Sequence, residues 1–128
     1  MVKASELRIG NKVTYKDQVD EVLSIHDSGS VFLSRGLYVR TRNIYPVPLT
    51  RDLLLEYGFI ESYEGIFQHG RLTEVFNTLK EFFFRYDGKI IASCKYLHEL
   101  QNIYFSLYRE EIKVYVSAVL TKFKKMPV

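Results

Sequence analysis

The stretch YLHELQNIYFSLYREEI, Tyr96 to Ile112, is the most regular segment of this chain and decides its fold. Apolar residues recur in it at steps of three and four, which places them on one side of a helix from about Lys95 to Tyr108. We interpret this segment as the spine of a small fold rather than as an active site. The apolar side is formed by Leu97, Leu100, Ile103, Tyr104 and Leu107.

Composition sets the broad class of the protein. The chain has 128 residues, of which 47% are hydrophobic and 26% are charged, as expected for one globular domain. Ten Tyr and nine Phe supply both core volume and amphipathic contact surface. Because aromatic residues also favour strands, we expect a protein of mixed α and β structure.

Charge and cysteine usage indicate where the protein works. A net charge of +3 gives mild attraction to anions, well short of the dense basic face of a protein that coats DNA. The single Cys94 cannot form an internal disulfide, and Met1–Lys12 lacks an apolar signal core. No apolar run approaches the roughly 18 residues that span a bilayer. We therefore expect a cytoplasmic protein without a membrane anchor.

Residues 1–48 predict a small β-barrel. Short alternating runs are separated by tight turns, and four short strands in about 45 residues are typical of a strongly bent SH3-like barrel. In the second run, Val19, Leu23 and Ile25 share one side, and Val22 breaks the pattern. The strands are expected to start near Lys12 and to cover Val19–Ile25, Val31–Ser34 and Leu37–Ile44.

Residues 49–128 predict an α+β region that completes one compact domain with the barrel. Thr50 is placed to cap a short helix, and turns at Gly65 and at Asp87-Gly88 predict two β-hairpins. The main amphipathic helix follows these hairpins. The fold class expected for the whole chain is therefore α+β, with an SH3-like barrel followed by hairpins and one main helix.

Two further segments of this region are less regular. LTEVFNTLK, residues 72–80, fits either a helical turn or a strand-like connection. IKVYVSAVL, residues 112–120, alternates as a final strand would, and is followed by a basic tail.

The histidine and cysteine residues do not form a recognisable metal-binding pattern. His98-Glu99 begins the zinc-protease pattern His-Glu-x-x-His, but Asn102 occupies the second histidine position. Cys94 and His98 are four residues apart, and a zinc site needs further ligands. We expect no metal and no cofactor, and we interpret His98 as a polar residue on the outer face of the helix.

Catalytic patterns are weak. Asp87 followed by Glu111 and Lys113 resembles the acid and acid-x-Lys arrangement of Mg²⁺-dependent nucleases. A turn at Asp87 and an exposed strand face at Glu111 and Lys113 explain these residues more simply. The sequence has no Gly-x-Ser-x-Gly nucleophile elbow and no phosphate-binding glycine pattern. We therefore expect a non-enzymatic protein with no catalytic residues, and a Mg²⁺ nuclease is a distant alternative.

The best candidate contact surface lies in YVRTR. Strand alternation places Tyr38, Arg40 and Arg42 on one side. The arginines can neutralise phosphates, and Tyr38 can stack on a base, as in single-strand-binding barrels. The other reading is that an exposed strand face carries charge for solubility.

Three segments together resemble a known family. The opening ELRIGNKV, the central PVPLTRDLLLEYGF and LHELQNIYFSLYREEI near the end are similar to a family of short proteins from bacterial phages, prophages and mobile elements. Members open with Glu-Leu-Arg-x-Gly-Asn and close with His-x-Leu-Gln-Asn-x-Tyr-Phe, here Glu6–Asn11 and His98–Phe105. The family ending hydrophobic-Thr-Gly-Glu-Glu is Leu107–Glu111 here, and its glycine is replaced by Arg109.

The resemblance implies a setting rather than a reaction. It implies an accessory protein of a phage or mobile element in the cytoplasm of a bacterial host, and it assigns no catalytic residue. The function hypothesis is binding to a bacterial host protein, including inhibition of a defence system such as a CRISPR effector. The alternative is a nucleic-acid-binding module that uses Tyr38, Arg40 and Arg42.

Overall fold

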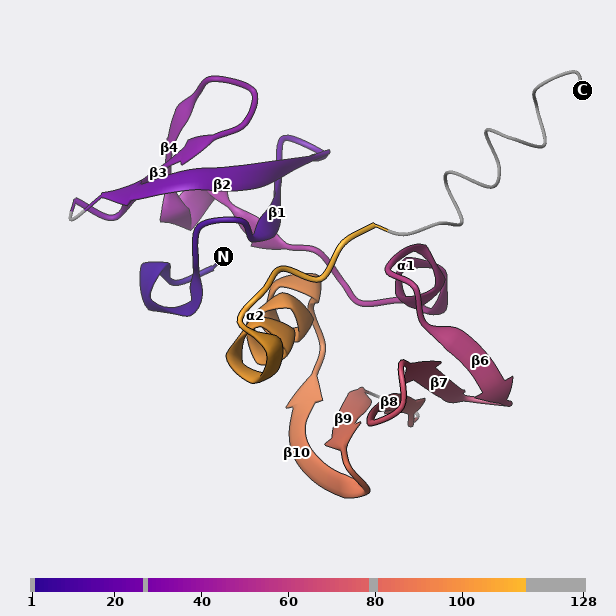
Figure 1. The fold of residues 1–128 in the computed structure, drawn as a ribbon. Coiled ribbons are helices and arrows are strands. Elements are labelled where there is room, and N and C mark those ends of the chain that lie inside the picture. The colour runs from indigo at the N-terminus through magenta and orange to yellow at the C-terminus, as the bar shows by residue number, and fades with distance from the viewer. Residues whose placement is uncertain (1, 27, 79–80, 115–128) are drawn as a thin grey trace, which may run out of the picture. The chain divides into compact units, whose positions relative to one another are not determined.

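The computed structural model describes residues 2–26, 28–78 and 81–114 (Figure 1). The described residues form two antiparallel five-stranded sheets and one long helix, which confirms the α+β class. The chain divides into two compact units. Unit 1 joins Met1–Pro48 to Tyr96–Glu111, and unit 2 joins Leu49–Lys95 to Ile112–Val128.

The sheet of unit 1 has the strand order β4-β3-β2-β1-β5. All neighbouring strands pair antiparallel. A 3-10 helix, η1 (Ala4–Glu6), precedes the sheet, and a second, η2 (Thr41–Asn43), joins β4 to β5. In the part of the chain that the structure describes, β4 and β5 are the edge strands, so the sheet is open. The strands are β1 (Lys12–Tyr15), β2 (Gln18–His26), β3 (Ser30–Leu33), β4 (Tyr38–Arg40) and β5 (Tyr45–Pro46).

Strand β2 turns Val22 to the core. Val22 is fully buried, and its partner on β3 is Leu33, which is also fully buried. Val22 therefore faces the core, away from the exposed Val19 and Leu23, which agrees with its predicted break in the pattern. The pairing register shifts between Val22 and Ser24, as at a β-bulge, and this changes the facing along the strand. The exposed apolar residues of β2 are Val19, Leu23 and Ile25.

The core of unit 1 is aliphatic. Valine, leucine and isoleucine side chains from β1 to β4 and from the flanking segments fill this core, and the Tyr15 ring packs against them. The residues of this core are Val2, Leu7, Val13, Val22, Val31, Leu33, Val39 and Ile44.

Helix α2 (Leu97–Tyr108) is the predicted main helix, with its start two residues later than expected. The Glu99 carboxylate accepts a hydrogen bond from the Tyr96 backbone N–H at 3.0 Å, which satisfies a free donor at the helix start. The helix ends at Arg109, which takes a left-handed backbone with φ of 58°. Glycine is the residue that adopts this conformation most easily, and the resemblance described above implies a glycine at this position.

The division of the chain differs from the predicted one in the place of α2. The predicted boundary after Pro48 coincides with a boundary between the units, but α2 belongs to unit 1 and not with residues 49–95. The physical reason is a set of hydrogen bonds from Gln101 and Asn102 to the segment before β1, described below. The sequence prediction used only the apolar side of this helix and not its polar side.

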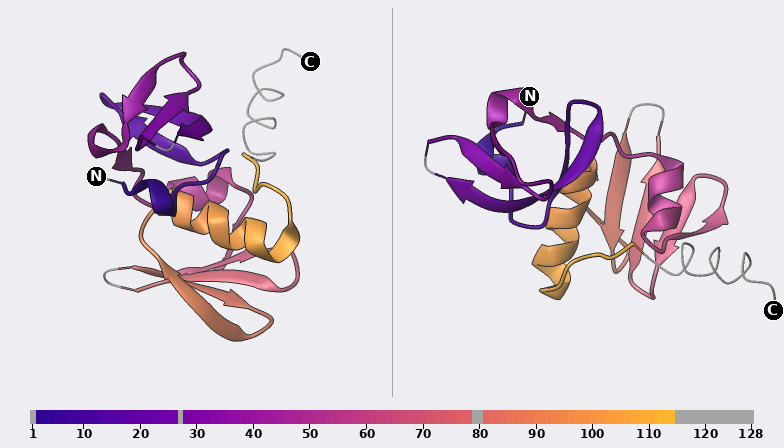
Figure 2. Two further views of the ribbon diagram at one scale, coloured as in Figure 1. Left: turned by 90° about the vertical axis from the view of Figure 1, so that its left-hand side faces the viewer. Right: turned by 90° about the horizontal axis from the view of Figure 1, so that it is seen from above.

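Unit 2 begins with α1 (Arg51–Glu56), and Thr50 caps it as predicted. The Thr50 hydroxyl oxygen accepts a hydrogen bond from the Leu53 N–H at 3.2 Å. Five strands follow as an antiparallel meander in the order β10-β9-β8-β7-β6 (Figure 2). The predicted hairpins at Gly65 and at Asp87-Gly88 are confirmed. The strands are β6 (Ile60–Tyr63), β7 (Ile66–His69), β8 (Thr73–Asn77), β9 (Phe82–Tyr86) and β10 (Lys89–Cys94).

The structure decides the secondary structure of one of the two less regular segments and describes only part of the other. Of the two readings of residues 72–80, the strand is right for Thr73–Asn77, because β8 pairs with both β7 and β9, and residues 79 and 80 lie outside the described residues. The predicted final strand over residues 112–120 is wrong for Ile112–Val114, which are irregular. Its remaining residues, 115–120, and the basic tail lie outside the described residues.

We expect Leu100→Ala to lower the free energy of unfolding by about 2–5 kcal/mol, because Leu100 is 0% exposed and its truncation leaves a cavity. Denaturant unfolding followed by circular dichroism measures the change. Leu37→Ala is the matched control, since Leu37 is exposed, and it should cost no more than about 0.5 kcal/mol. Equal effects of the two substitutions would show that the apolar side of α2 is not part of the core.

Candidate functional site

Three rings gather on the outer face of the sheet in unit 1. Tyr38 of β4 lies with its ring centroid 4.6 Å from that of Phe32 on β3 and 5.3 Å from that of His26 on β2. The Tyr38 side chain is 67% exposed, while its neighbour Val39 is buried. The predicted alternation is therefore confirmed at Tyr38. We call His26, Phe32 and Tyr38 the ring cluster.

Only one of the two predicted arginines lies on the strand of this cluster. Arg40 is the last residue of β4, is exposed, and donates a long hydrogen bond of 3.4 Å to the Ser28 carbonyl. Arg42 lies in η2, because the chain leaves the extended conformation after Arg40. The prediction that strand alternation aligns Arg42 with Tyr38 and Arg40 is therefore wrong. A 3-10 turn has a period of three residues, and it redirects the side chain.

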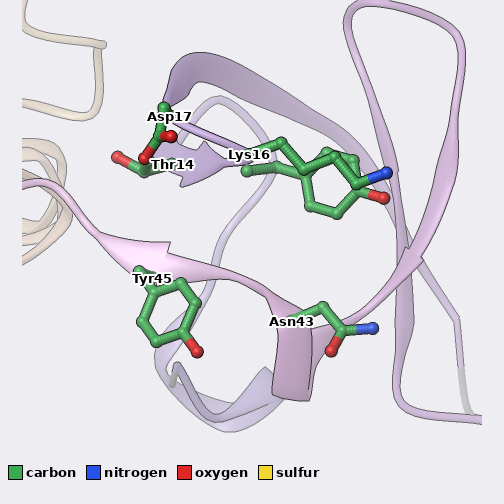
Figure 3. Close-up of a pocket in the computed structure, with 6 residues that line it drawn as sticks. Thr14, Lys16, Asp17, Asn43 and Tyr45 are labelled. Carbon is green, nitrogen blue, oxygen red and sulfur yellow. The ribbon is translucent and has the colours of Figure 1, made fainter.

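A groove that the sequence did not predict lies between the β1–β2 turn and β5 (Figure 3). It has a volume of about 530 Å³ and is open to solvent. Figure 3 shows the Tyr45 ring and the Asn43 amide on one side, and Thr14, Lys16 and Asp17 on the other. We call this the tyrosine groove; it is lined by Thr14, Tyr15, Lys16, Asp17, Asn43 and Tyr45.

An ion pair between Arg35, which is partly exposed, and Asp20, which is buried, fixes one wall of the tyrosine groove. The Arg35 guanidinium donates to the Asp20 carboxylate at 2.6 Å and to the Tyr15 carbonyl at 2.5 Å. The same guanidinium lies 5.2 Å from the centroid of the Tyr15 ring, within range of a cation–π interaction. Asp20 is buried and accepts a further bond from the Ser34 hydroxyl. The Tyr15 side of the groove is thus preorganised.

The turn that forms the rim of the tyrosine groove is strained. Lys16 and Asp17 have φ of 47° and 64°, so both positions of a two-residue hairpin turn are left-handed without a glycine. Such turns favour Asn-Gly, because other side chains raise the energy of this conformation. Backbone strain of this kind persists where the surrounding structure enforces it, and it is frequent at functional sites.

The two family-like motifs meet in the fold, and the polar side chain of Asn102 joins them. The Asn102 side-chain oxygen accepts hydrogen bonds from Arg8 Nε at 3.1 Å and from Asn11 Nδ2 at 2.8 Å. Its side-chain nitrogen donates to the Glu6 carbonyl at 3.0 Å. The Asn102 amide therefore makes three hydrogen bonds to the Glu6–Asn11 segment. These bonds hold α2 against the start of β1.

Gln101 makes the second half of this connection. Its side-chain oxygen accepts from the Lys12 N–H at 2.8 Å, and its nitrogen donates to the Gly10 carbonyl at 3.1 Å. Gly10 has φ of 99°, and a Cβ on it would lie 3.2 Å from the Glu111 carboxylate. The motif needs glycine here for both reasons.

Arg8 adds further contacts to α2 and to the residues after it. Its guanidinium lies 4.1 Å from the Phe105 ring centroid and forms an ion pair with Glu111. We call the side chains of Arg8, Asn11, Gln101 and Asn102 the amide clasp. Every one of these motif residues has a structural partner within unit 1, so the clasp helps to hold this unit together.

His98 is buried, contrary to the prediction that it lies on the outer helix face. Its side chain is 3% exposed, its ring stacks on Tyr96 at 6.0 Å, and Nε2 is 3.9 Å from the Glu6 carboxylate. Its Nδ1 has no hydrogen-bond partner in the described part of the chain. Burial lowers the pKa of His98, and the charges of Glu99 and Glu6 oppose this only in part.

The residues of the nuclease-like pattern have other roles in the structure. Asp87 takes φ of 50° in the β9–β10 turn, as a type I′ turn with Gly88 requires. Glu111 pairs with Arg8 and lies in an irregular stretch, so the predicted strand face at Glu111 and Lys113 is wrong. Among residues 2–26, 28–78 and 81–114, no three His, Cys, Asp or Glu side chains are grouped as metal ligands.

Comparison with protein-family models, curated proteins and solved structures gives no match to this chain. Within the described ranges, no helix is long and apolar enough to cross a membrane. Sequence reasoning found Tyr38 and Arg40 but missed the tyrosine groove, because Tyr15 and Tyr45 become neighbours only when β5 pairs with β1. The sequence feature that could have indicated the groove is Lys16-Asp17, a hairpin turn without glycine.

We expect Gln101→Leu to lower the free energy of unfolding by roughly 2–4 kcal/mol. The side chain is 2% exposed, and leucine would leave the Lys12 N–H and the Gly10 carbonyl without their partner. Denaturant unfolding gives the loss, and hydrogen exchange should be faster at the Lys12 amide. Gln18→Leu, on an exposed glutamine, is the control. A stable variant with an unchanged Lys12 amide would contradict the structural role of the clasp.

We expect the protein to lose stability as the pH falls below about 6.5, and His98→Gln to reduce that loss. The folded-state pKa of His98 is lowered below the ordinary 6.5, so the unfolded chain binds the proton first and protonation favours unfolding. The stabilisation is complete above pH 6.5 and is lost as the pH falls toward the folded-state pKa. Denaturant unfolding at about pH 7.5 and about pH 5.5 measures it.

The pKa of His69 is also lowered by burial, so His98→Gln should retain part of the pH dependence. His26→Gln serves as the control, because His26 is exposed. An unchanged pH dependence in His98→Gln, or an equal reduction in the control, would contradict the assignment.

Proposed function

We propose that this chain is a non-enzymatic binding protein of phage or mobile-element origin that contacts a host protein in the bacterial cytoplasm. A defence nuclease, such as a CRISPR effector, is the partner class that this setting suggests. The resemblance carried by Glu6–Asn11 and His98–Phe105 supports the setting. The observation that supports protein binding is the tyrosine groove with its strained turn.

The chemistry of the groove suits a segment of protein. Tyr15 and Tyr45 offer large, rigid contact area with a polar end, which is the surface that protein interfaces favour. Lys16 and Asp17 add one charge of each sign, and Asn43 adds an amide that both donates and accepts. This mixture complements a peptide better than it complements a uniformly anionic backbone.

The finer fold assignment supports the same proposal. We infer an SH3-like arrangement for residues 1–48, in which a four-strand meander is followed by a 3-10 turn and a fifth strand that returns to the first. In such an arrangement the groove lies between a hairpin turn and the entry to the last strand, and concave aromatic surfaces there take extended segments.

The alternative is nucleic-acid binding, and the ring cluster favours it. Exposed Tyr38, with Phe32 and His26 behind it and Arg40 at the strand end, offers stacking beside a positive charge. The net charge of the chain argues against strong binding of nucleic acid. The chain has 18 Lys and Arg against 15 Asp and Glu, and the excess equals the three lysines of the tail, Lys122, Lys124 and Lys125.

The test is affinity capture of partners from bacterial lysate by the tagged protein, with and without nuclease treatment, read by mass spectrometry and nucleic-acid staining. We expect a discrete protein that survives nuclease treatment. Tyr45→Ala should reduce its capture at least tenfold, whereas the pair Tyr38→Ala and Arg40→Ala should leave it unchanged. Leu72→Ala, in unit 2, is the control for loss of an exposed apolar side chain.

A second variant separates binding from folding. Lys16→Asn with Asp17→Gly relieves the turn strain and should raise the free energy of unfolding by about 1–2 kcal/mol. It should nevertheless weaken capture, because both groove side chains are lost. Capture of nucleic acid alone, lost in salt and in the Tyr38 and Arg40 pair, would replace the proposal with the alternative.

A further inference from the structure

The sheet of unit 2 has one apolar row on the face opposite its core. Residues paired across strands point to the same side, and Tyr63 pairs with Ile66, Ile66 with Phe76, and Phe76 with Phe83. The row therefore runs across β6, β7, β8 and β9. We call Tyr63, Ile66, Phe76 and Phe83 the apolar row.

The core lies on the other face. Phe67, Val75 and Phe84 are the chain neighbours of the row residues, and they are almost completely buried. Because successive side chains of a strand point to opposite faces, the apolar row points away from this core. Tyr63 is 75% exposed, and Ile66, Phe76 and Phe83 are partly exposed. The Phe76 and Phe83 rings stack on each other at 5.3 Å.

A second row beside it carries a single charge pair. Glu74 and Arg85 pair across β8 and β9, and the carboxylate accepts from Arg85 Nε at 3.1 Å. The row ends in exposed isoleucines, Ile60 on β6 and Ile90 on β10. We call Ile60, Gln68, Glu74, Arg85 and Ile90 the charged row. It is electrically neutral overall.

These two rows are self-complementary. Consider a two-fold axis parallel to the strands that passes between β8 and β9 and in front of the exposed face. It exchanges the positions of β8 and β9 in the facing copy. Phe76 of one copy then lies over Phe83 of the other, and Glu74 lies over Arg85. Each contact occurs twice, as a two-fold interface requires.

We propose that a second copy of this chain packs on this face about that axis. The charges favour a second copy as the partner, because Glu74 and Arg85 of one copy each face the opposite charge on the other copy. The strands of the two copies are aligned, as in common face-to-face sheet packing at a separation of about 10 Å. This interface is separate from the tyrosine groove and does not depend on the proposed function.

The size of the face predicts a reversible dimer. Five strands at the usual spacing make a surface only about 20 Å across, which is at the small end of specific interfaces. The dimer should therefore form as the protein concentration rises. Sedimentation equilibrium of the full chain, from micromolar to roughly millimolar concentration, measures the dimerisation constant.

Charge reversal gives the decisive experiment. Glu74→Arg places two arginines on each face, and Arg85→Glu places two glutamates there, so each variant alone should dimerise at least tenfold more weakly than the wild type. Mixed in equal amounts, the two variants place arginines over glutamates. We expect the mixture to regain dimerisation of wild-type strength, as a heterodimer.

The mixture also controls for folding, because each variant loses the ion pair within its own chain whether or not it dimerises. Phe76→Ser should weaken the dimer without reaching the core, and Leu37→Ser, on an exposed side chain of unit 1, should leave it unchanged. A wild-type protein that stays monomeric to roughly millimolar concentration would overturn the proposal. A mixture that dimerises no better than its components would overturn the proposed geometry.

Discussion

Asn11 and Asn102 are 91 positions apart in the sequence, yet 2.8 Å separates the amide nitrogen of one from the amide oxygen of the other. Together with Arg8 and with Gln101, which bonds to Gly10 across the same number of positions, they form the amide clasp on which the rest of unit 1 depends. Buried amides with saturated partners are directional. A helix held only by its apolar side could slide or rotate, whereas one held through Gln101 and Asn102 has one position in which every donor meets its acceptor.

The clasp also explains why the residues of the Glu6–Asn11 and His98–Phe105 motifs need not form a functional site. The Arg8 side chain contacts Asn102, Glu111 and the Phe105 ring. The groups that remain open to a partner are elsewhere. They are the tyrosine groove, the ring cluster and the outer face of the second sheet, and in each of them exposed aromatic rings lie on regular strands or next to a tight turn.

These three surfaces differ in what they can recognise. The tyrosine groove is concave and carries both charges, which suits a segment of protein. The ring cluster is a platform with Arg40 at its end, which suits stacking. The outer face of the second sheet combines the apolar row with one Glu74–Arg85 pair, and its pattern matches itself.

The sequence by itself determined the local elements. Period-two runs and turn residues located most of the strands, Thr50 located the start of α1, and the steps of Leu97, Leu100 and Tyr104 located α2, because these signals come from residues close together in the chain. It also identified Tyr38 and Arg40 as exposed. The SH3-like barrel and the phage setting remain predictions from pattern and resemblance.

Only the tertiary structure decided which unit α2 joins, which side of β2 is buried, and that His98 is buried. Each depends on groups that are distant in sequence, such as Gln101 with Lys12, or Val22 with Leu33. The same holds for the groove, since Tyr15 and Tyr45 meet only through the pairing of β1 with β5. Local propensity describes what each segment can form, whereas long-range hydrogen bonding and burial select which faces meet.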